Sequence, residues 1–189
     1  MWTRAAQVKR IYRSQEMPEQ KMIKNCNLRL IQQDITDFEI EAFVFYAQPN
    51  LELGAGFGSA ITRRGGQSIK KELDEIGPLS VTEAAITGGG NLKAKYIVHA
   101  VGPAFQEEQL EEKLHTTILN ALKKAEEKGI RHIALPPMGT GFYGVPLATS
   151  LSIMSRAFEE YVSQGGKMEE IVICANDPRE YRAFQGAFG

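Results

Sequence analysis

Short apolar runs alternate with amphipathic segments of helical period along most of the chain, and this alternation constrains the fold more than any single motif does. The runs are six to eight residues long and rich in β-branched and aromatic side chains, as strands are. Several are apolar throughout, which is typical of strands buried on both faces of a sheet. The expected strands are 28–35, 41–48, 83–88, 95–101, 132–138 and 170–176.

The segments between these runs predict helices. From residue 108 to residue 128, apolar side chains recur every three or four positions, which places them on one face of a helix. Gly129 ends that pattern, because glycine adopts the left-handed conformation at a helix C-terminus without steric cost. The other expected helices are 59–65, 68–77, 147–163 and 179–184.

Strands that alternate with helices predict one α/β domain, with a mixed, mostly parallel sheet and helices on both of its faces. The stretch 86–96, ITGGGNLKAKY, differs because a short glycine-rich turn joins two strand-like runs, which indicates an antiparallel hairpin. The length of 189 residues and the hydrophobic content of 43% suit a single globular domain, which we place at residues 25–189.

Charge is distributed unevenly along the chain. Residues 1–24 carry six Lys or Arg and two Glu, whereas the remainder carries sixteen Lys or Arg and twenty-one Asp or Glu. We expect a basic N-terminal leader that is either disordered or an extra helix. The net charge of −1 gives no general attraction to nucleic acid or anionic lipid, so neither is an expected partner. Neither a run of 18 apolar residues nor a secretory signal is recognisable.

The chain has two cysteines, Cys26 and Cys174. They are far apart, and neither belongs to a Cys and His spacing typical of zinc ligands, so the sequence predicts no disulfide framework and no metal or other cofactor. This usage is typical of a reduced environment, and we expect a cytoplasmic protein. Cys174 and His99 lie within apolar runs, where a core role is expected rather than a catalytic one. The oligomeric state is left open.

Three expected strand ends carry the residues most suited to ligand binding. In open α/β sheets, ligands bind in a crevice beyond the carboxyl ends of the strands. The first end is followed by Asp34, whose carboxylate can accept a hydrogen bond from an exocyclic amine or can cap a turn. The second is followed by LGAGFGSAI (53–61) and the third by GTGFYG (139–144). Both readings of Asp34 stay open at this point.

The two glycine-rich segments predict a site for a diphosphate. Bare backbone N–H groups beside a helix N-terminus bind anions, and two such loops on one crevice suit two linked phosphates. GTGFYG matches the pattern GxGxxG, but the 45 residues after Gly144 are too few for the second half of a Rossmann dinucleotide site. A P-loop is excluded because the chain lacks GxxxxGK[ST].

Taken together and in order, the motifs resemble those of the macro domain family, whose members are modules of ADP-ribose recognition. The resemblance covers residues 26–189 and implies a three-layer α/β/α sandwich with a mixed sheet of about six strands. The segments that carry it are QDIT (33–36), LGAGFGSAI (53–61), GGQSI (65–69), AAITGGGNLKAKYIVHAVGP (84–103) and LPPMGTGFYGVP (135–146).

The resemblance implies a role for each candidate residue and ADP-ribose or an ADP-ribosylated protein as the partner. Asp34 would bind the adenine amine, with the backbone of Ile35 beside it. Asn176 stands where the family often has an aromatic ring that stacks on adenine. Tyr143 or Phe142 would line the ribose or adenine side. The residues implied to wrap the diphosphate and the distal ribose are Gly54, Ala55, Gly56, Phe57, Gly58, Gly139, Thr140, Gly141 and Phe142.

The chain departs from the family where catalysis is concerned. Many catalytic macro domains carry Asn-Ala-Ala-Asn after the second strand, and here that segment reads Phe45, Tyr46, Ala47 and Gln48. The family's hydrolytic branch also tends to have an acidic residue or histidine in or just after the first glycine loop, where this chain has Gly58 and Thr62.

A ligand can still bind through backbone amides when these polar side chains are missing. Activation of a water molecule, in contrast, needs a basic side chain within hydrogen-bond reach of it. We therefore favour a binding module for ADP-ribose or a related nucleotide and name no catalytic residue. The alternatives are a hydrolase of ADP-ribosyl esters, such as an O-acetyl-ADP-ribose deacetylase, and a degenerate macro fold that binds protein.

Overall fold

The computed structural model describes residues 19–104 and 106–186. Within them, one mixed sheet of seven strands has the order β1-β2-β7-β6-β3-β5-β4, so the expected α/β class is confirmed with one strand more than the six expected. The five central strands are parallel, and the edge strands β1 and β4 are antiparallel to their neighbours. The strands are β1 (Glu19–Ile23), β2 (Cys26–Gln32), β3 (Ala42–Ala47), β4 (Ala84–Gly88), β5 (Tyr96–Val101), β6 (His132–Leu135) and β7 (Glu170–Ala175).

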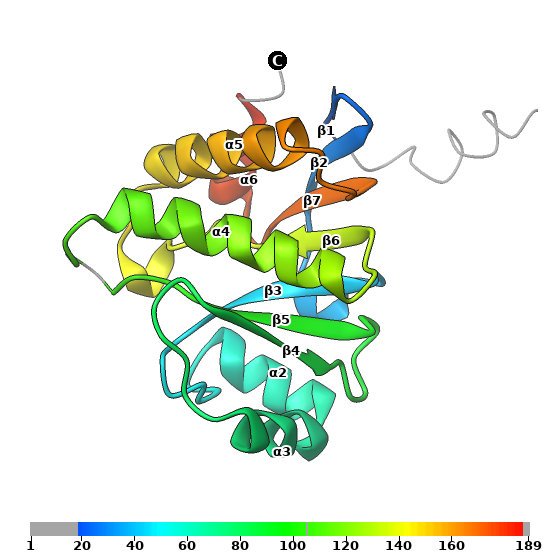
Figure 1. The fold of residues 1–189 in the computed structure, drawn as a ribbon, viewed down its shortest axis with the longest axis vertical. Coiled ribbons are helices and arrows are strands. Elements are labelled where there is room, and N and C mark those ends of the chain that lie inside the picture. The colour runs from blue at the N-terminus through cyan, green and yellow to red at the C-terminus, as the bar shows by residue number, and fades with distance from the viewer. Residues whose placement is uncertain (1–18, 105, 187–189) are drawn as a thin grey trace, which may run out of the picture.

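Helices cover both faces of the sheet, which gives the three layers implied by the resemblance (Figure 1). Helices α2 and α3 pack on one face, and α4, α5 and α6 pack on the other. Every expected helix is present with bounds shifted by two residues at most. The helices are α2 (Phe57–Gly65), α3 (Gln67–Ile76), α4 (Leu110–Glu127), α5 (Leu147–Ser163) and α6 (Pro178–Gln185), and the short 3-10 helices are η1 (Ile35–Asp37) and η2 (Gly141–Tyr143).

The position of β3 inside the sheet, between β6 and β5, explains why its sequence is apolar throughout. Its six residues are all buried, and because side chains alternate across a strand, they divide between two hydrophobic cores. Phe45 points into the core beneath α2 and α3, whereas Tyr46 points into the core beneath α4 and α5. Phe45 and Tyr46 are neighbours in the sequence but pack on opposite faces of the sheet.

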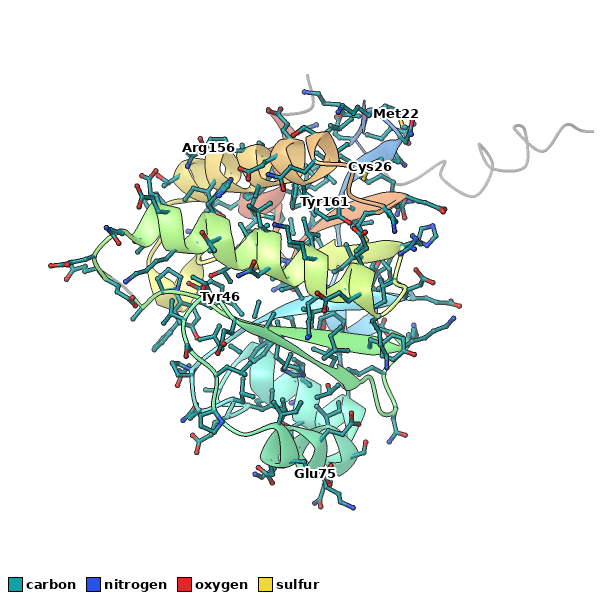
Figure 2. The ribbon with its side chains drawn as sticks, in the orientation of Figure 1. Met22, Cys26, Tyr46, Glu75, Arg156 and Tyr161 are labelled. Carbon is teal, nitrogen blue, oxygen red and sulfur yellow. The ribbon has the colours of Figure 1, made fainter. Side chains whose placement is uncertain are left out.

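Strand β1 was not expected, because it lies within the segment 1–24 that we interpreted as a leader. It pairs with β2 in antiparallel register, with Glu19 opposite Leu30. It is an edge strand with little burial, and Met22 is 61% exposed at the rim of the molecule (Figure 2). The described part of the leader is thus a strand and its turn, and the predictions for residues 1–18 lie outside the described residues.

The hairpin predicted at 86–96 is present as the antiparallel pair β4 and β5. His99 of β5 is fully buried, as expected for a core residue, and its Nε2 lies 2.9 Å from Oγ1 of Thr87. Burial lowers the pKa of His99 to about 4, so the ring is neutral at pH 7. None of the described helices is long and apolar enough to cross a membrane.

A cavity at the carboxyl ends of four strands

A cavity of about 720 Å³ opens where β2, β7, β6 and β3 end. Two of these strands, β2 and β6, stop three residues earlier than expected. Strand β2 ends at Gln32, before Asp34 caps the next turn, and β6 ends at Leu135 because Pro136 and Pro137 have no N–H group for the sheet. The chain beyond these early ends forms the cavity wall.

The structure brings all the residues proposed from the sequence around this single cavity, while their contact with a ligand stays a prediction. Both glycine-rich segments lie in its wall. The predicted residues in its wall are Asp34, Ile35, Gly54, Ala55, Gly56, Phe57, Gly58, Gly139, Thr140, Gly141, Phe142, Tyr143 and Asn176.

The first glycine loop, residues 54–58, leads directly into helix α2. Gly56 is the N-cap residue of this helix, and none of the described side chains caps it. A Cβ atom added at Gly54 or Gly56 would meet nothing within 4 Å, so the backbone is bare toward the cavity. The first N–H groups of α2 lack intrahelical partners, which makes this end of the helix suited to an anion.

The second glycine loop, residues 139–144, is a chain reversal that contains η2. Gly139, Gly141 and Gly144 all have positive φ angles, of 76°, 63° and 73°, which favour glycine. The N–H of Gly144 donates to the carbonyl of Gly141 at 3.0 Å, and that of Val145 donates to the carbonyl of Gly139 at 3.0 Å. These bonds fix the shape of the loop before any ligand is present.

Core packing also holds the second loop. A Cβ atom at Gly139 would lie 2.9 Å from Cγ2 of Val145 and 3.1 Å from Cδ2 of Leu114. Thr140 anchors the other side of the loop, because its Oγ1 donates to the carbonyl of Pro137 at 2.9 Å. The loop is therefore pressed against α4 with no room for a methyl group at its first glycine.

Asp34 caps η1 and forms an ion pair at the same time. Its Oδ1 accepts hydrogen bonds from the Thr36 N–H at 2.9 Å and from Thr36 Oγ1 at 2.7 Å, and its Oδ2 accepts one from Arg64 at 2.8 Å. Partial burial raises the pKa of Asp34, but the bonds from Thr36 and the Arg64 charge outweigh it and hold this pKa below its usual value. Asp34 thus caps the turn, as one of its two readings predicted. Its ionised carboxylate is 44% exposed and also lines the cavity.

Tyr46 packs against the second glycine loop from inside the molecule. Its ring lies 4.2 Å from the ring of Tyr143, and its hydroxyl donates to the carbonyl of Pro103 at 2.7 Å. Gly102 provides the space, because a Cβ atom there would lie 2.0 Å from Cζ of Tyr46. Figure 2 shows Tyr46 inside the molecule, between the sheet and α4. Tyr46 and Phe45 line the cavity wall and leave the cavity open.

Aromatic rings gather where β3 ends. Phe45 meets Phe57 edge to face with ring centroids 5.1 Å apart, and Phe142 meets Tyr143 in the same manner at 5.3 Å. Phe142 is 87% exposed, although it is a large apolar side chain. Burial raises the pKa of Tyr143, and the side chain of Gln48 lowers it in part.

The charged side chains in the described cavity wall are all acidic: Asp34, Glu52 and Glu180. Glu180 accepts a hydrogen bond from the N–H of Asn176 at 2.8 Å. Cys174 also lines the cavity, but burial raises its pKa to about 12, so it is a neutral thiol and not a nucleophile. No three His, Cys, Asp or Glu side chains of the described residues are placed to hold a metal ion.

Sequence reasoning missed several residues of this wall. Gln33 and Glu52 lie beside a strand end and a glycine loop, and this position was the available signal, whereas Glu180 lies in the first turn of α6. The guanidinium of Arg64, in the last turn of α2, lies against Asp34, a pairing over 30 positions that no local pattern reveals.

The family model described as Macro domain matches residues 46–154. An uncharacterized protein of Saccharolobus solfataricus is 39% identical over 163 residues, which cover 84% of this chain and 90% of that protein. A macro domain-containing protein of Caldanaerobacter subterraneus is 35% identical over 170 residues, which cover 85% of this chain and 95% of the relative.

Solved structures share the fold. The Oceanobacillus iheyensis macrodomain with ADP superposes with a TM-score of 0.84 at 24% identity, over 90% of this chain and 94% of that one. The Trypanosoma brucei macrodomain in complex with ADP-ribose gives a TM-score of 0.80 at 25% identity, over 86% of this chain and 69% of the other. The three-layer architecture described above is therefore that of these proteins.

Proposed function

Because this chain belongs to the macro domain family, we propose that its cavity binds ADP-ribose, either free or attached to a protein. The observation that carries the proposal is the convergence of two bare glycine loops on one cavity at the carboxyl ends of the strands. Such loops neutralise a diphosphate through N–H groups, so they need no particular side chain. The ligand in the Trypanosoma brucei macrodomain structure, ADP-ribose, supports this choice.

The strand order gives the bound nucleotide a direction. Asp34 follows β2 and Gln48 follows β3, and these strands are separated by β7 and β6. Three inter-strand spacings amount to about 14 Å, a length suited to an extended nucleotide. Adenine lies at the β2 end in this proposal, with its amine donating to Asp34 beside the backbone of Ile35. The diphosphate lies between the two glycine loops.

Binding without turnover is the favoured activity. The Asp34 carboxylate is already engaged by Thr36 and Arg64, the Cys174 thiol is neutral, and His99 is buried outside the cavity wall. These three groups are therefore poorly suited to act as a general base. In this proposal the glycine loops and the ionised Asp34 bind the nucleotide and do not take part in its hydrolysis.

Hydrolysis of an ADP-ribosyl ester is the second candidate, and one observation favours it. The Glu52 carboxylate lines the cavity beside the first glycine loop, and none of the described residues donates a hydrogen bond to it. A carboxylate in that position could activate a water molecule. Incubation with O-acetyl-ADP-ribose and with an ADP-ribosylated protein, followed by mass spectrometry, separates the two activities. Release well above the uncatalysed rate would establish the enzyme.

Titration calorimetry with ADP-ribose tests the binding proposal directly. We expect Asp34→Ala to weaken binding by about tenfold, because a hydrogen bond to a charged group is lost. The same variant should lose the preference for ADP-ribose over its inosine counterpart, which lacks the amine. Asp74→Ala is the matched control, since Asp74 is an exposed carboxylate paired with Lys70 on α3.

Two results would contradict the proposal in different ways. If the wild-type protein binds the inosine counterpart as tightly as ADP-ribose, Asp34 does not recognise adenine. If the wild-type protein binds no ADP-ribose at all, the cavity is not a nucleotide site, and a degenerate macro fold that binds protein becomes the better description.

A further inference from the structure

Arg64 holds the adenine end of the cavity, although it is not one of the described residues that line the cavity. It lies in the last turn of α2, and its Nη1 donates to Oδ2 of Asp34 at 2.8 Å and to Oγ1 of Thr36. Both acceptors belong to η1 and its cap, the turn that brings Ile35 to the cavity wall. One side chain of α2 therefore fastens the segment that is proposed to contact adenine.

The hydrogen bonds of Asp34 leave one acceptor position for a ligand. An ionised carboxylate offers about four such positions, divided between its two oxygens. Those on Oδ1 are taken by the N–H of Thr36 at 2.9 Å and by its Oγ1 at 2.7 Å, and Arg64 takes one on Oδ2. With the described residues counted, one position remains on Oδ2, and it matches one N–H of an exocyclic amine.

The three side chains hold one another in place. Thr36 Oγ1 donates to Asp34 Oδ1 and accepts from Arg64, while Arg64 also donates to Asp34 Oδ2. A carboxylate held at both oxygens has a fixed plane, whereas a carboxylate held at one oxygen can rotate. Without Arg64, Thr36 would hold Oδ1 alone, and Oδ2 could turn away from the amine.

Arg64 also offsets negative charge in the cavity wall. The charged side chains of the described wall, Asp34, Glu52 and Glu180, are all acidic, and a diphosphate is itself negative. A positive charge beside Asp34 reduces the repulsion between that carboxylate and the ligand. The side chains of Arg64 and Asp34 are 41% and 44% exposed, so water screens the pair and its contribution to stability is small. A variant at Arg64 should therefore fold normally.

We propose that Arg64 is a positioning residue for base recognition, which holds the Asp34 carboxylate with one oxygen available to the adenine amine and does not itself touch the ligand. This inference rests on the proposed function, because it takes the contact between Asp34 and adenine as its premise. It adds that selection of a base with an amino group depends on a second side chain. A base with a carbonyl group in that place, such as hypoxanthine, is disfavoured because the held, ionised carboxylate can only accept hydrogen bonds.

Two substitutions of Arg64 test the inference by titration calorimetry with ADP-ribose and its inosine counterpart. Arg64→Met removes the charge and the N–H groups but keeps a long side chain. It should weaken ADP-ribose binding about fivefold and reduce the preference over the inosine counterpart from about tenfold to about threefold or less. Arg64→Lys should restore most of both, because a single nitrogen, Nη1, makes both bonds and an ammonium group can replace it.

A double variant tests whether Arg64 acts through Asp34. In the Asp34→Ala background, Arg64→Met should weaken ADP-ribose binding by less than about twofold further, because the carboxylate that Arg64 positions is gone. A further loss of about fivefold in that background would mean that Arg64 acts independently of Asp34, and it would overturn the inference.

Two controls separate positioning from the loss of charge and from the loosening of η1. Arg63→Met removes a positive charge from the same turn of α2, on an exposed side chain. Lys93→Met removes the 2.8 Å ion pair with Asp37, the last residue of η1. Both variants should keep the wild-type affinities and preference. A loss in either control equal to that in Arg64→Met would assign the effect to charge or to the anchoring of η1, and the inference would be wrong.

The outcomes separate the inference from the proposed function. A preference for ADP-ribose that falls in Arg64→Met and returns in Arg64→Lys supports the inference. If the wild-type protein prefers ADP-ribose over the inosine counterpart and Arg64→Met keeps that preference, the inference is overturned and the adenine site stands. If the wild-type protein has no such preference, or binds no ADP-ribose, the proposed contact of Asp34 is wrong and the inference fails with it.

Discussion

The first and the second glycine loop face the same cavity, but they are held in place differently. Residues 54–58 take their shape from the start of α2, and Gly54 and Gly56 have open space around them. Residues 139–144 are closed by hydrogen bonds within the loop and pressed against Leu114 and Val145. The first loop is mostly exposed backbone at a helix end, whereas the second is anchored in the core at Gly139 and exposed at Gly141 and Phe142.

This difference separates the contribution of glycine to binding from its contribution to stability. In the first loop, Gly54 and Gly56 keep the surface bare for a ligand, whereas a Cβ atom at Gly58 would lie 3.0 Å from the backbone of Leu53. In the second loop, Gly139 is required because a side chain would collide with the core, while Gly141 is required for its positive φ and its open surface. Substitutions at these positions should therefore affect different measurements.

The largest expected effect is on binding, from Gly141→Glu. A Cβ atom at this position meets nothing within 4 Å, so the side chain can be accommodated, but it adds a carboxylate where the diphosphate is proposed to lie. Repulsion between like charges should weaken ADP-ribose binding by at least about 100-fold, measured by calorimetry.

Gly165→Glu controls for the change in charge and for backbone strain. Gly165 lies beyond the end of α5, has a φ angle of 89°, and also has open space around it. Both variants should lose similar stability, and Gly165→Glu should bind normally. Unchanged affinity in Gly141→Glu would show that the second loop does not contact the ligand.

The second effect is on stability, from Gly139→Ala. The positive φ costs about 1 kcal/mol and the collision with Val145 and Leu114 costs about 2 kcal/mol more, so the free energy of unfolding should fall by about 3 kcal/mol in urea denaturation. Gly129→Ala is the matched control, because its φ is 87° and its surroundings are open, so only about 1 kcal/mol should be lost. Equal losses in the two variants would mean that core packing does not hold the second loop.

The smallest effect compares two positions within the first loop. Gly56→Ala should lower the free energy of unfolding by about 2 kcal/mol, because its φ of 64° and ψ of −119° lie outside the left-handed region that other residues can enter, whereas Gly54→Ala should change it by less than about 0.5 kcal/mol. Thermal or urea unfolding of both variants measures the difference. A large loss in Gly54→Ala would show that this loop too depends on packing.

The order of strands and helices could be predicted because burial on both faces leaves a clear apolar signal, as β3 and β7 show. Strand β1 could not, because its side chains are mostly exposed and its sequence, EQKMI, has no period-two alternation of apolar and polar residues. The segment becomes a strand because it pairs with β2, and this pairing is not encoded in its own sequence pattern.

The lining of the cavity was predictable from strand ends and glycine spacing, but the bonds among its residues were not. The Asp34 and Arg64 pair joins the end of β2 to α2, and the Tyr46 ring reaches under Tyr143 because Gly102 leaves space on a neighbouring strand's end. Such contacts depend on how separate elements pack, and they have no counterpart in local sequence.

Cys174 lies in the cavity wall with its thiol protonated, because burial raises its pKa. Peroxides and electrophiles react with thiolates, so this sulfur resists oxidation near neutral pH. Cys174 is also only 2% exposed, so peroxide should leave this part of the cavity wall unmodified while more accessible thiolates in other proteins are already oxidised.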